Sequence, residues 1–498
     1  MLNYTSSRSL SSSGYYDARL RRQQLYRAAK NGGRKHATRH KERHFPFHHL
    51  PSEIIAEIFV LCLPDSERFF NSIKSKDAAP LLLCNVSSSW RSLVLSIPRL
   101  WNKLCIRIEN PKVDIDLATA MADSWIARSG ELPLSLRLHC YGWNEKEKVT
   151  AMVQAHLNTF FRYASRWESV DITLFGCSPV SFPNFGPTPL LRKFSYSTSC
   201  RVSVPFPFTS CPLLSNITWP FSCFVASNRD PDIPWHQLTH INLKHIISAH
   251  QTLDILRTCQ MLVEFNVEID DDLSLEVRSR RKPVENQSLR SFQICVYIAC
   301  PGLLESLILP ALTDFSLYTD FDIHSYILPR SVHPQLLRLF TRSKCKLEKL
   351  SLENCGFNDA GILKCLKHDS CSSLTELEIV NDFDRPMFTD RVIRALTNKD
   401  GLSEGNNVLL PKLSCLSLEM CVSASPGILG LMIITRCLWW DKDNQLKSLS
   451  LTVRDDLDDI DEAFLKIAEE SGLEVEITNM KCDTDSESTE DLYDTDDS

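Results

Sequence analysis

The chain of 498 residues is long enough for two or more domains or for one extended array of repeats. Its 43% hydrophobic and 23% charged residues are ordinary for a globular protein, and its net charge of −7 does not by itself identify a partner. The longest apolar stretch, residues 427–440, is too short to span a bilayer and contains Arg436. The first residues lack the apolar core of a secretory signal, so we expect a soluble intracellular protein, cytoplasmic and/or nuclear, without a membrane partner.

The two ends of the chain carry opposite charges. Residues 1–48 contain eleven Lys or Arg and two acids, whereas residues 482–498 contain eight acids and no Lys or Arg. Both segments are poor in apolar residues, which predicts disordered termini. The basic segment could also serve nuclear import or contact nucleic acid, but a solvated tail is the favoured interpretation and nucleic-acid binding is not expected.

Histidines and cysteines are the residues of this chain that could bind a transition metal. His36, His40, His44 and His48 fall four residues apart, and on a helix they would share one face that could bind zinc or nickel. The surrounding Lys and Arg oppose a cation, so we predict no metal site. The 19 cysteines form no C-x-x-C pair and are expected to be reduced, mostly buried thiols. No cofactor is expected.

The first predicted element is a short helix within HHLPSEIIAEIFVLCLP, residues 48–64. Pro51 suits the first turn of a helix, because its missing N–H would have no partner there. Ile54, Ile58 and Phe59 follow at helical spacing and make an apolar face. Pro64 ends the helix, and a polar loop follows it.

Two more small helices are predicted after this loop, which covers residues 65–79. One covers residues 81–85, and the other is capped by Ser87 or Ser88 and ends before Pro98. Three helices within about fifty residues make too small a core to be very stable alone. We therefore expect this unit to pack against a partner, either the downstream chain or another protein.

The downstream sequence repeats the pattern apolar-x-x-apolar-x-apolar. The early spacings are 23 to 27 residues and the later ones reach 39. Looser units precede it near Leu104, Pro133 and Trp167, separated by predicted helices at 117–128 and 149–163. The ten clear units begin at Leu191, Leu214, Leu238, Leu262, Leu289, Leu312, Leu347, Leu374, Leu413 and Leu446.

This pattern is the signature of a leucine-rich repeat, in which each unit supplies one short strand and only the stack of units buries a continuous core. The alternative is a set of independent strands in an α/β domain. Ten matches at nearly regular spacing favour the solenoid, with parallel short strands on a concave face and helices on a convex face.

The segment from His49 to Trp101 resembles an F-box of the form found in mushroom-forming fungi. The resemblance rests on Leu50-Pro51, the Ile54/Ile58/Phe59 face, Val86, the pair Trp90-Arg91 and the closing Pro98-x-x-Trp101. It implies a three-helix F-box followed by the α/β leucine-rich-repeat solenoid. The expected organisation is a disordered basic segment at 1–48, an F-box at 49–103, a solenoid at 104–479 and a disordered acidic tail at 480–498.

The resemblance also implies a role. F-box proteins bind a Skp-family adaptor, and through it the cullin of an SCF ubiquitin ligase, while their C-terminal repeats capture the target. By carry-over from the family, the residues expected to contact or support the adaptor are Leu50, Pro51, Ile54, Ile58, Leu82, Val86, Trp90 and Leu93. For each of them, a place in the core of the three-helix unit is an equal alternative.

No catalytic motif was found: the chain has no G-x-x-x-x-G-K-[ST], G-x-S-x-G or H-E-x-x-H. We therefore predict a non-catalytic subunit that holds a target near chemistry done elsewhere. An interaction scaffold without a link to ubiquitination, and a nucleic-acid-associated protein, remain as alternatives.

The residues beside the inward leucines should point to the concave face and are the candidates for binding a protein target. Acids dominate its middle and C-terminal part, so a basic or hydrogen-bonding segment of the target is one hypothesis, and simple solvation is the alternative. The candidates are Glu264, Asn266, Glu268, Asp314, Tyr318, Lys349, Glu353, Glu376, Glu378 and Glu419.

Overall fold

The fold is seen in a computed structural model. It describes residues 50–64, 76–108, 114–141, 146–182, 186–198, 211–219, 233–269, 282–296, 301–319, 332–381, 387–397, 409–438, 444–453 and 456–480. The predicted disordered segment at 1–48, residues 481–498 of the predicted tail and most of the loop at 65–79 lie outside these residues, and so do the four spaced histidines. The chain divides into two units, 1–58 and 59–498, and each is described by itself.

In the first unit the described residues lead into helix α2 (Ser52–Leu61), which crosses the boundary between the units. The backbone N–H groups of Ile54 and Ile55 donate to the carbonyl oxygen of Pro51 at 3.0 and 3.1 Å. Pro51 therefore stands at the start of the helix, where the sequence predicted it, and the helix stops before Pro64.

The second unit begins with two helices that the sequence also predicted, α3 (Leu81–Cys84) and α4 (Ser88–Leu95). Ser87 is the N-cap of α4, and its hydroxyl accepts a hydrogen bond from the N–H of Trp90 at 3.1 Å. The chain then turns through the 3-10 helix η2 (Pro98–Leu100). Trp101 follows this turn and is buried, and its indole N–H donates to the carbonyl oxygen of Val94 at 2.9 Å.

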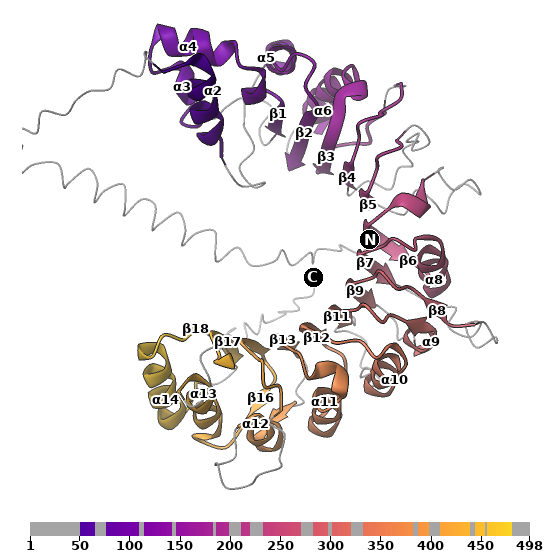
Figure 1. The fold of residues 1–498 in the computed structure, drawn as a ribbon, viewed down its shortest axis with the longest axis vertical. Helices are drawn as coiled ribbons and strands as arrows, with labels where there is room; N and C mark the ends of the chain where they lie inside the picture. The colour runs from indigo at the N-terminus through magenta and orange to yellow at the C-terminus, as the bar shows by residue number, and fades with distance from the viewer. Residues whose placement is uncertain are drawn as a thin grey trace, which may run out of the picture. The chain divides into compact units, whose positions relative to one another are not determined.

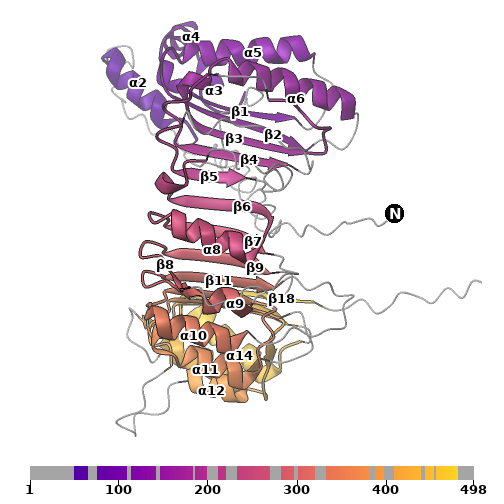
Figure 2. The ribbon, with the colours of Figure 1, turned by 90° about the vertical axis from the view of Figure 1, so that its right-hand side faces the viewer.

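The rest of the second unit is built on one parallel sheet of 14 strands that lie in chain order (Figures 1 and 2). Two short parallel pairs lie outside this sheet, β8 (Val284–Glu285) with β10 (Leu307–Ile308), and β14 (Phe388–Thr389) with β16 (Val422–Ser423). The strands of the large sheet are β1 (Lys103–Ile108), β2 (Leu134–Tyr141), β3 (Trp167–Phe175), β4 (Lys193–Thr198), β5 (Asn216–Trp219), β6 (His240–Ile247), β7 (Glu264–Ile269), β9 (Ser291–Val296), β11 (Asp314–Thr319), β12 (Lys349–Glu353), β13 (Glu376–Val380), β15 (Cys415–Glu419), β17 (Ser448–Val453) and β18 (Glu474–Asn479).

Each of the ten predicted repeat motifs leads into one of these strands, and the three looser units give β1, β2 and β3. The strand β18 was missed, because its sequence does not follow the repeat pattern. The α/β class with a long parallel sheet is therefore confirmed, and this arrangement is compatible with a solenoid.

Helices connect many of the strands and lie on one face of the sheet, which we call the helix-covered face; the other is the open face (Figure 1). The predicted helices at 117–128 and 149–163 correspond to the first two of the set. The helices are α5 (Ile115–Arg128), α6 (Lys146–Phe161), α8 (Ala249–Thr258), α9 (Pro301–Glu305), α10 (His333–Ser343), α11 (Asp359–Leu366), α12 (Asp390–Leu396), α13 (Ile428–Leu438) and α14 (Asp459–Glu470), with 3-10 turns η3 (Ala164–Arg166), η5 (Trp235–Gln237) and η6 (Asp369–Cys371).

The core lies between the sheet and these helices. Buried side chains of neighbouring strands pair in register, so that each repeat covers the apolar surface of the next repeat. Phe265, Phe292 and Phe315 form one such run, with ring centroids 5.6 and 6.2 Å apart, and all three are fully buried.

Cysteine fills part of this core. The fifteen cysteines within the described residues are free thiols, and eleven of them are buried. No helix in the described part of the chain combines the length and the apolar character needed to cross a membrane.

Candidate functional site

The residues predicted to bind an adaptor differ in exposure. In the first unit Ile54 is 48% exposed and Pro51 is also exposed, while Leu50 and Ile58 are half-buried. An exposed isoleucine on a short helix costs hydration free energy unless something covers it.

In the second unit Leu82 and Val86 are 46% and 56% exposed, and Trp90 and Leu93 are half-buried. The ring of Trp90 lies 4.9 Å from that of Phe59, which is fully buried. Trp90 therefore has a structural role in this small helical unit, as the alternative interpretation expected.

Sequence reasoning missed two exposed leucines in the same part of the chain. Leu61 is 78% exposed and Leu95 is 39% exposed. Leu61 follows Ile54 and Ile58 at helical spacing on α2, so the apolar face of this helix is wider than the small helical unit covers. The width of this apolar face, compared with the small core of the three-helix unit, is the signal that could have placed Leu61 among the adaptor contacts.

The second candidate surface is the open face of the sheet. Because side chains alternate along a strand, every second residue stands on this face, and the parallel register aligns them into rows. The first row runs Lys103, Ser135, Ser169, Lys193, Asn216, His240, Glu264, Ser291, Asp314, Lys349, Glu376, Cys415, Ser448, Glu474. The second row runs Cys105, Arg137, Asp171, Ser195, Thr218, Asn242, Asn266, Gln293, Ser316, Ser351, Glu378, Ser417, Ser450, Glu476.

All ten residues predicted to face a target belong to these rows or to a third row beside them. The third row runs over the later strands as Glu268, Cys295, Tyr318, Glu353, Val380, Glu419, Thr452, Thr478. Over the first strands it contains Arg107, His139, Thr173 and Ser197. The structure also adds two acids that sequence reasoning missed, Glu474 and Glu476 on β18.

The charge of the open face changes sign between β6 and β7. The rows over β1–β6 carry four Lys or Arg and one acid, whereas the rows over β7–β18 carry nine acids and one lysine. At the change of sign, Nε2 of His240 lies 3.9 Å from Oε2 of Glu264.

Asp171, the one acid in the rows over β1–β6, is neutralised by its neighbours. Its Oδ2 lies 3.2 Å from Nε of Arg137 and 3.2 Å from Nε2 of His139. Burial alone would raise the pKa of Asp171, but its hydrogen bond and charge interaction with His139, together with the charge of Arg137, hold the pKa below its usual range. Arg137 therefore compensates the charge of Asp171, and the excess of positive charge over β1–β6 lies on Lys103, Arg107 and Lys193.

Lys349, the one base in the rows over β7–β18, is neutralised in the same way. Its Nζ lies 2.5 Å from Oε2 of Glu376, and this hydrogen bond raises the pKa of the lysine. The pKa of the neighbouring Asp314 is raised by burial, and the charges of Glu376 and Glu264 raise it further while Lys349 opposes them. Mutual repulsion of carboxylates is therefore already felt within this half of the face.

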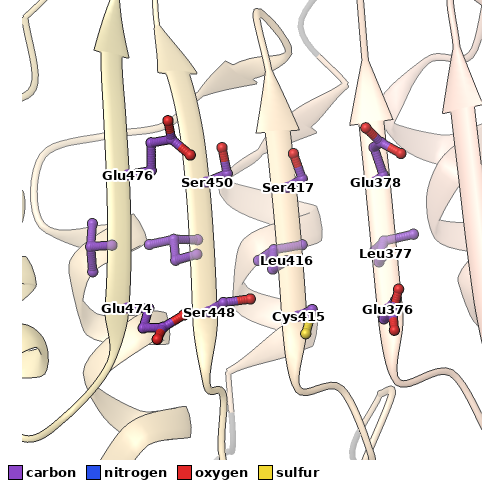
Figure 3. A pocket seen from close by; sticks show the side chains of 12 residues that line it. Glu376, Leu377, Glu378, Cys415, Leu416, Ser417, Ser448, Ser450, Glu474 and Glu476 are labelled. Atoms are coloured by element: carbon purple, nitrogen blue, oxygen red, sulfur yellow. The ribbon is translucent and has the colours of Figure 1, made fainter. Parts of the chain in front are cut away.

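The acidic half contains a hollow of about 430 Å³ across four strands, β13, β15, β17 and β18 (Figure 3). Glu376 and Glu378 stand on one side of it and Glu474 and Glu476 on the other, with small side chains between them (Figure 3). These are Cys415, Ser417, Ser448 and Ser450. The hollow exists because the two middle strands carry small residues where the outer strands carry glutamates.

In the described part of the chain, no three His, Cys, Asp or Glu side chains converge in a way that could hold a metal ion. Neither the comparison with known protein families nor the comparison with curated proteins finds a match for this chain. Two surfaces bear on the function: the exposed aliphatic side chains of the short helices and the open face of the sheet.

Proposed function

We propose that this protein is a non-catalytic substrate receptor of an SCF-type ubiquitin ligase. Its N-terminal helices form an F-box that binds a Skp-family adaptor, and through it a cullin, and its leucine-rich repeats hold the protein to be ubiquitinated. The protein itself supplies position: it raises the concentration of the target near the ubiquitin carrier.

One observation carries the proposal. The short helices that resemble an F-box expose aliphatic side chains, above all Leu82 and Val86, whose hydration is unfavourable. Truncation of an aliphatic side chain that anchors an interface typically weakens binding by about tenfold or more.

The test is the affinity of the full-length protein for a fungal Skp-family adaptor, measured by isothermal titration calorimetry. Leu82→Ala and Val86→Ala are each expected to weaken binding by about tenfold, because each removes apolar contact area. Leu438→Ala on α13 is the matched control, since Leu438 is 44% exposed and Leu82 is 46% exposed. Absence of binding by the folded wild-type chain, or equal losses in all three variants, would contradict the proposal.

Cullin co-purification separates this function from that of a scaffold not linked to ubiquitination. A ligase subunit brings down both adaptor and cullin, whereas a scaffold brings down its partners without the cullin.

A further inference from the structure

Three features of the described chain have no role in the proposed function so far. The outer surfaces of α13 and α14 expose Leu431, Leu438, Ile460 and Ile467, but nothing in the structure indicates what covers them. The buried thiols of Cys365 and Cys371 interact, but only the raised pKa of Cys371 points to a role. The division of charge on the open face goes further, because its geometry specifies the chemistry of a partner.

We propose that the open face binds an extended protein segment whose charge changes sign along its length, with its basic part over β7–β18 and its acidic part over β1–β4. This inference rests on the proposed role of the repeats in holding a target. It adds to that role the chemical class of the target and the position of each half.

The charges of the open face favour a segment of this kind. The rows over β7–β18 have an excess of eight negative charges, and the rows over β1–β6 an excess of three positive charges, with the histidines counted as neutral. A uniformly basic segment would be repelled over the first strands, and a uniformly acidic one over the last. A segment with one block of each sign is attracted along the whole face and is held in a single orientation.

The length of the sheet sets the length of the segment. Neighbouring strands lie about 4.8 Å apart, so the 14 strands of the sheet extend over roughly 60 Å measured along the sheet. An extended chain advances about 3.3 Å per residue, so a segment of roughly 20 residues covers the face from end to end. The change of sign at His240 and Glu264 falls near the middle of that path.

One place in the acidic half has room for a side chain of the segment. The hollow of about 430 Å³ between Glu378 and Glu476 is large enough for a lysine or arginine side chain, which could reach carboxylates on either side. No hollow is needed over the first strands, where Lys103 and Lys193 are exposed and can reach toward acidic residues of the segment.

The experiment measures binding of three fluorescent 20-residue peptides to the full-length protein by fluorescence anisotropy. Two have a block of alternating Asp-Ser and a block of alternating Lys-Ser, in opposite orders. The third has the same composition with Asp and Lys evenly mixed, so all three have the same net charge. At least one block peptide is expected to bind roughly tenfold more tightly than the mixed peptide.

Two sets of variants locate the segment. The triple substitution E378Q/E474Q/E476Q should weaken binding of the block peptide roughly tenfold. The control E462Q/E469Q/E470Q removes three exposed acids from α14 on the helix-covered face and should change it less than about twofold. In the same way K103Q/K193Q should weaken binding, while K364Q/K466Q on α11 and α14 should not.

Equal binding of block and mixed peptides, or equal losses in the face variants and their controls, would overturn the inference. So would tighter binding of a 20-nucleotide single-stranded DNA than of either block peptide. The affinity for the adaptor is measured on the same samples. Loss of peptide binding with intact adaptor binding overturns this inference alone, and peptide binding without adaptor binding overturns the proposed ligase function alone.

Discussion

At the scale of single residues, the most unusual feature of the fold is a fully buried arginine. Arg436 is 0% exposed, and its guanidinium donates to the carbonyl oxygens of Leu396 at 2.9 Å, Leu410 at 3.0 Å and Leu409 at 2.6 Å. Burial lowers the pKa of Arg436 to about 10, yet at neutral pH it stays protonated. In the sequence analysis, Arg436 served only as evidence that the apolar stretch at 427–440 does not span a membrane.

Arg436 is one of several side chains that satisfy backbone carbonyls near the ends of helices on neighbouring units. Asn286 donates to Leu256 and Cys259, and Arg342 donates to the carbonyl of Leu304 at 2.7 Å. These residues take up the free carbonyl groups that each helix leaves at its C-terminal end. A sequence pattern made of leucines does not reveal them, because their positions vary from unit to unit.

The second residue with a testable consequence is Asp461, which is 4% exposed and accepts a hydrogen bond from the N–H of Gly430 at 2.5 Å. Burial, and a hydrogen bond with Asp458, raise the pKa of Asp461 from its ordinary 3.8 to about 6. The folded state therefore binds this proton more tightly than the unfolded state. The stability it contributes is complete below about pH 4 and is lost as the pH rises through 6.

Asp461→Asn should make the protein more stable than the wild type by roughly 1–2 kcal/mol at pH 8, because the amide carries no charge to bury. The difference should shrink as the pH falls from 8 to 4. Urea unfolding at several pH values measures it, and Asp459→Asn, which removes an exposed charge from the same helix, is the control. A difference that does not change with pH would show that Asp461 is not the titrating group.

At the scale of elements, the packing of α13 against α14 depends on a glycine. A Cβ placed on Gly430 would lie 2.7 Å from the Cβ of Phe464 and 2.9 Å from Oδ1 of Asp461. Neither neighbour can move easily, because the Cβ of Phe464 is fixed to its backbone and Asp461 is buried. The apolar run of α13 predicted a buried helix, but not how near its neighbour would be.

Gly430→Ala should therefore lower the free energy of unfolding by roughly 1–3 kcal/mol, although alanine has the higher helix propensity. Urea unfolding measures the loss, and Gly186→Ala is the control, since a Cβ on Gly186 meets nothing within 4 Å. Phe464→Gly removes the opposing Cβ, so Gly430→Ala should cost less in a Phe464→Gly background than in the wild type if the clash is the cause. Stability equal to the wild type would contradict the packing described here.

At the scale of the whole molecule, each repeat of the sheet is stabilised by the repeats next to it. Each strand of the large sheet pairs with the strands before and after it in chain order. A defect in one repeat therefore acts mainly on that repeat and its neighbours. The run of phenylalanines at Phe265, Phe292 and Phe315 lies in the middle of the sheet and allows a direct test.

Phe292→Ala should destabilise the chain by about 3–5 kcal/mol, because Phe292 is fully buried and its truncation leaves a cavity in the core. Hydrogen exchange followed by mass spectrometry should show faster exchange in β7, β9 and β11, with little change in β15 and β17. Exchange that rises equally in all strands would show instead that the sheet unfolds as a single cooperative unit.

The sequence by itself determined the α/β fold class of this protein and the position of most strands along the chain. Ten repeat motifs and three looser ones each mark a strand, because only a strand with alternating apolar residues can bury its leucines against neighbouring units. The three small helices were predicted for a similarly local reason, since proline and a serine cap act on the backbone within one turn.

Only the tertiary structure decided which side chains share a surface. The register of 14 strands gathers nine acids from one part of the chain and four bases from another into separate halves of one face. It also showed that β8 leaves the large sheet so that β7 pairs with β9, and that Arg436 and Asp461 are buried. These results depend on contacts between residues far apart in the sequence, and the periodicity of a single segment contains no information about them.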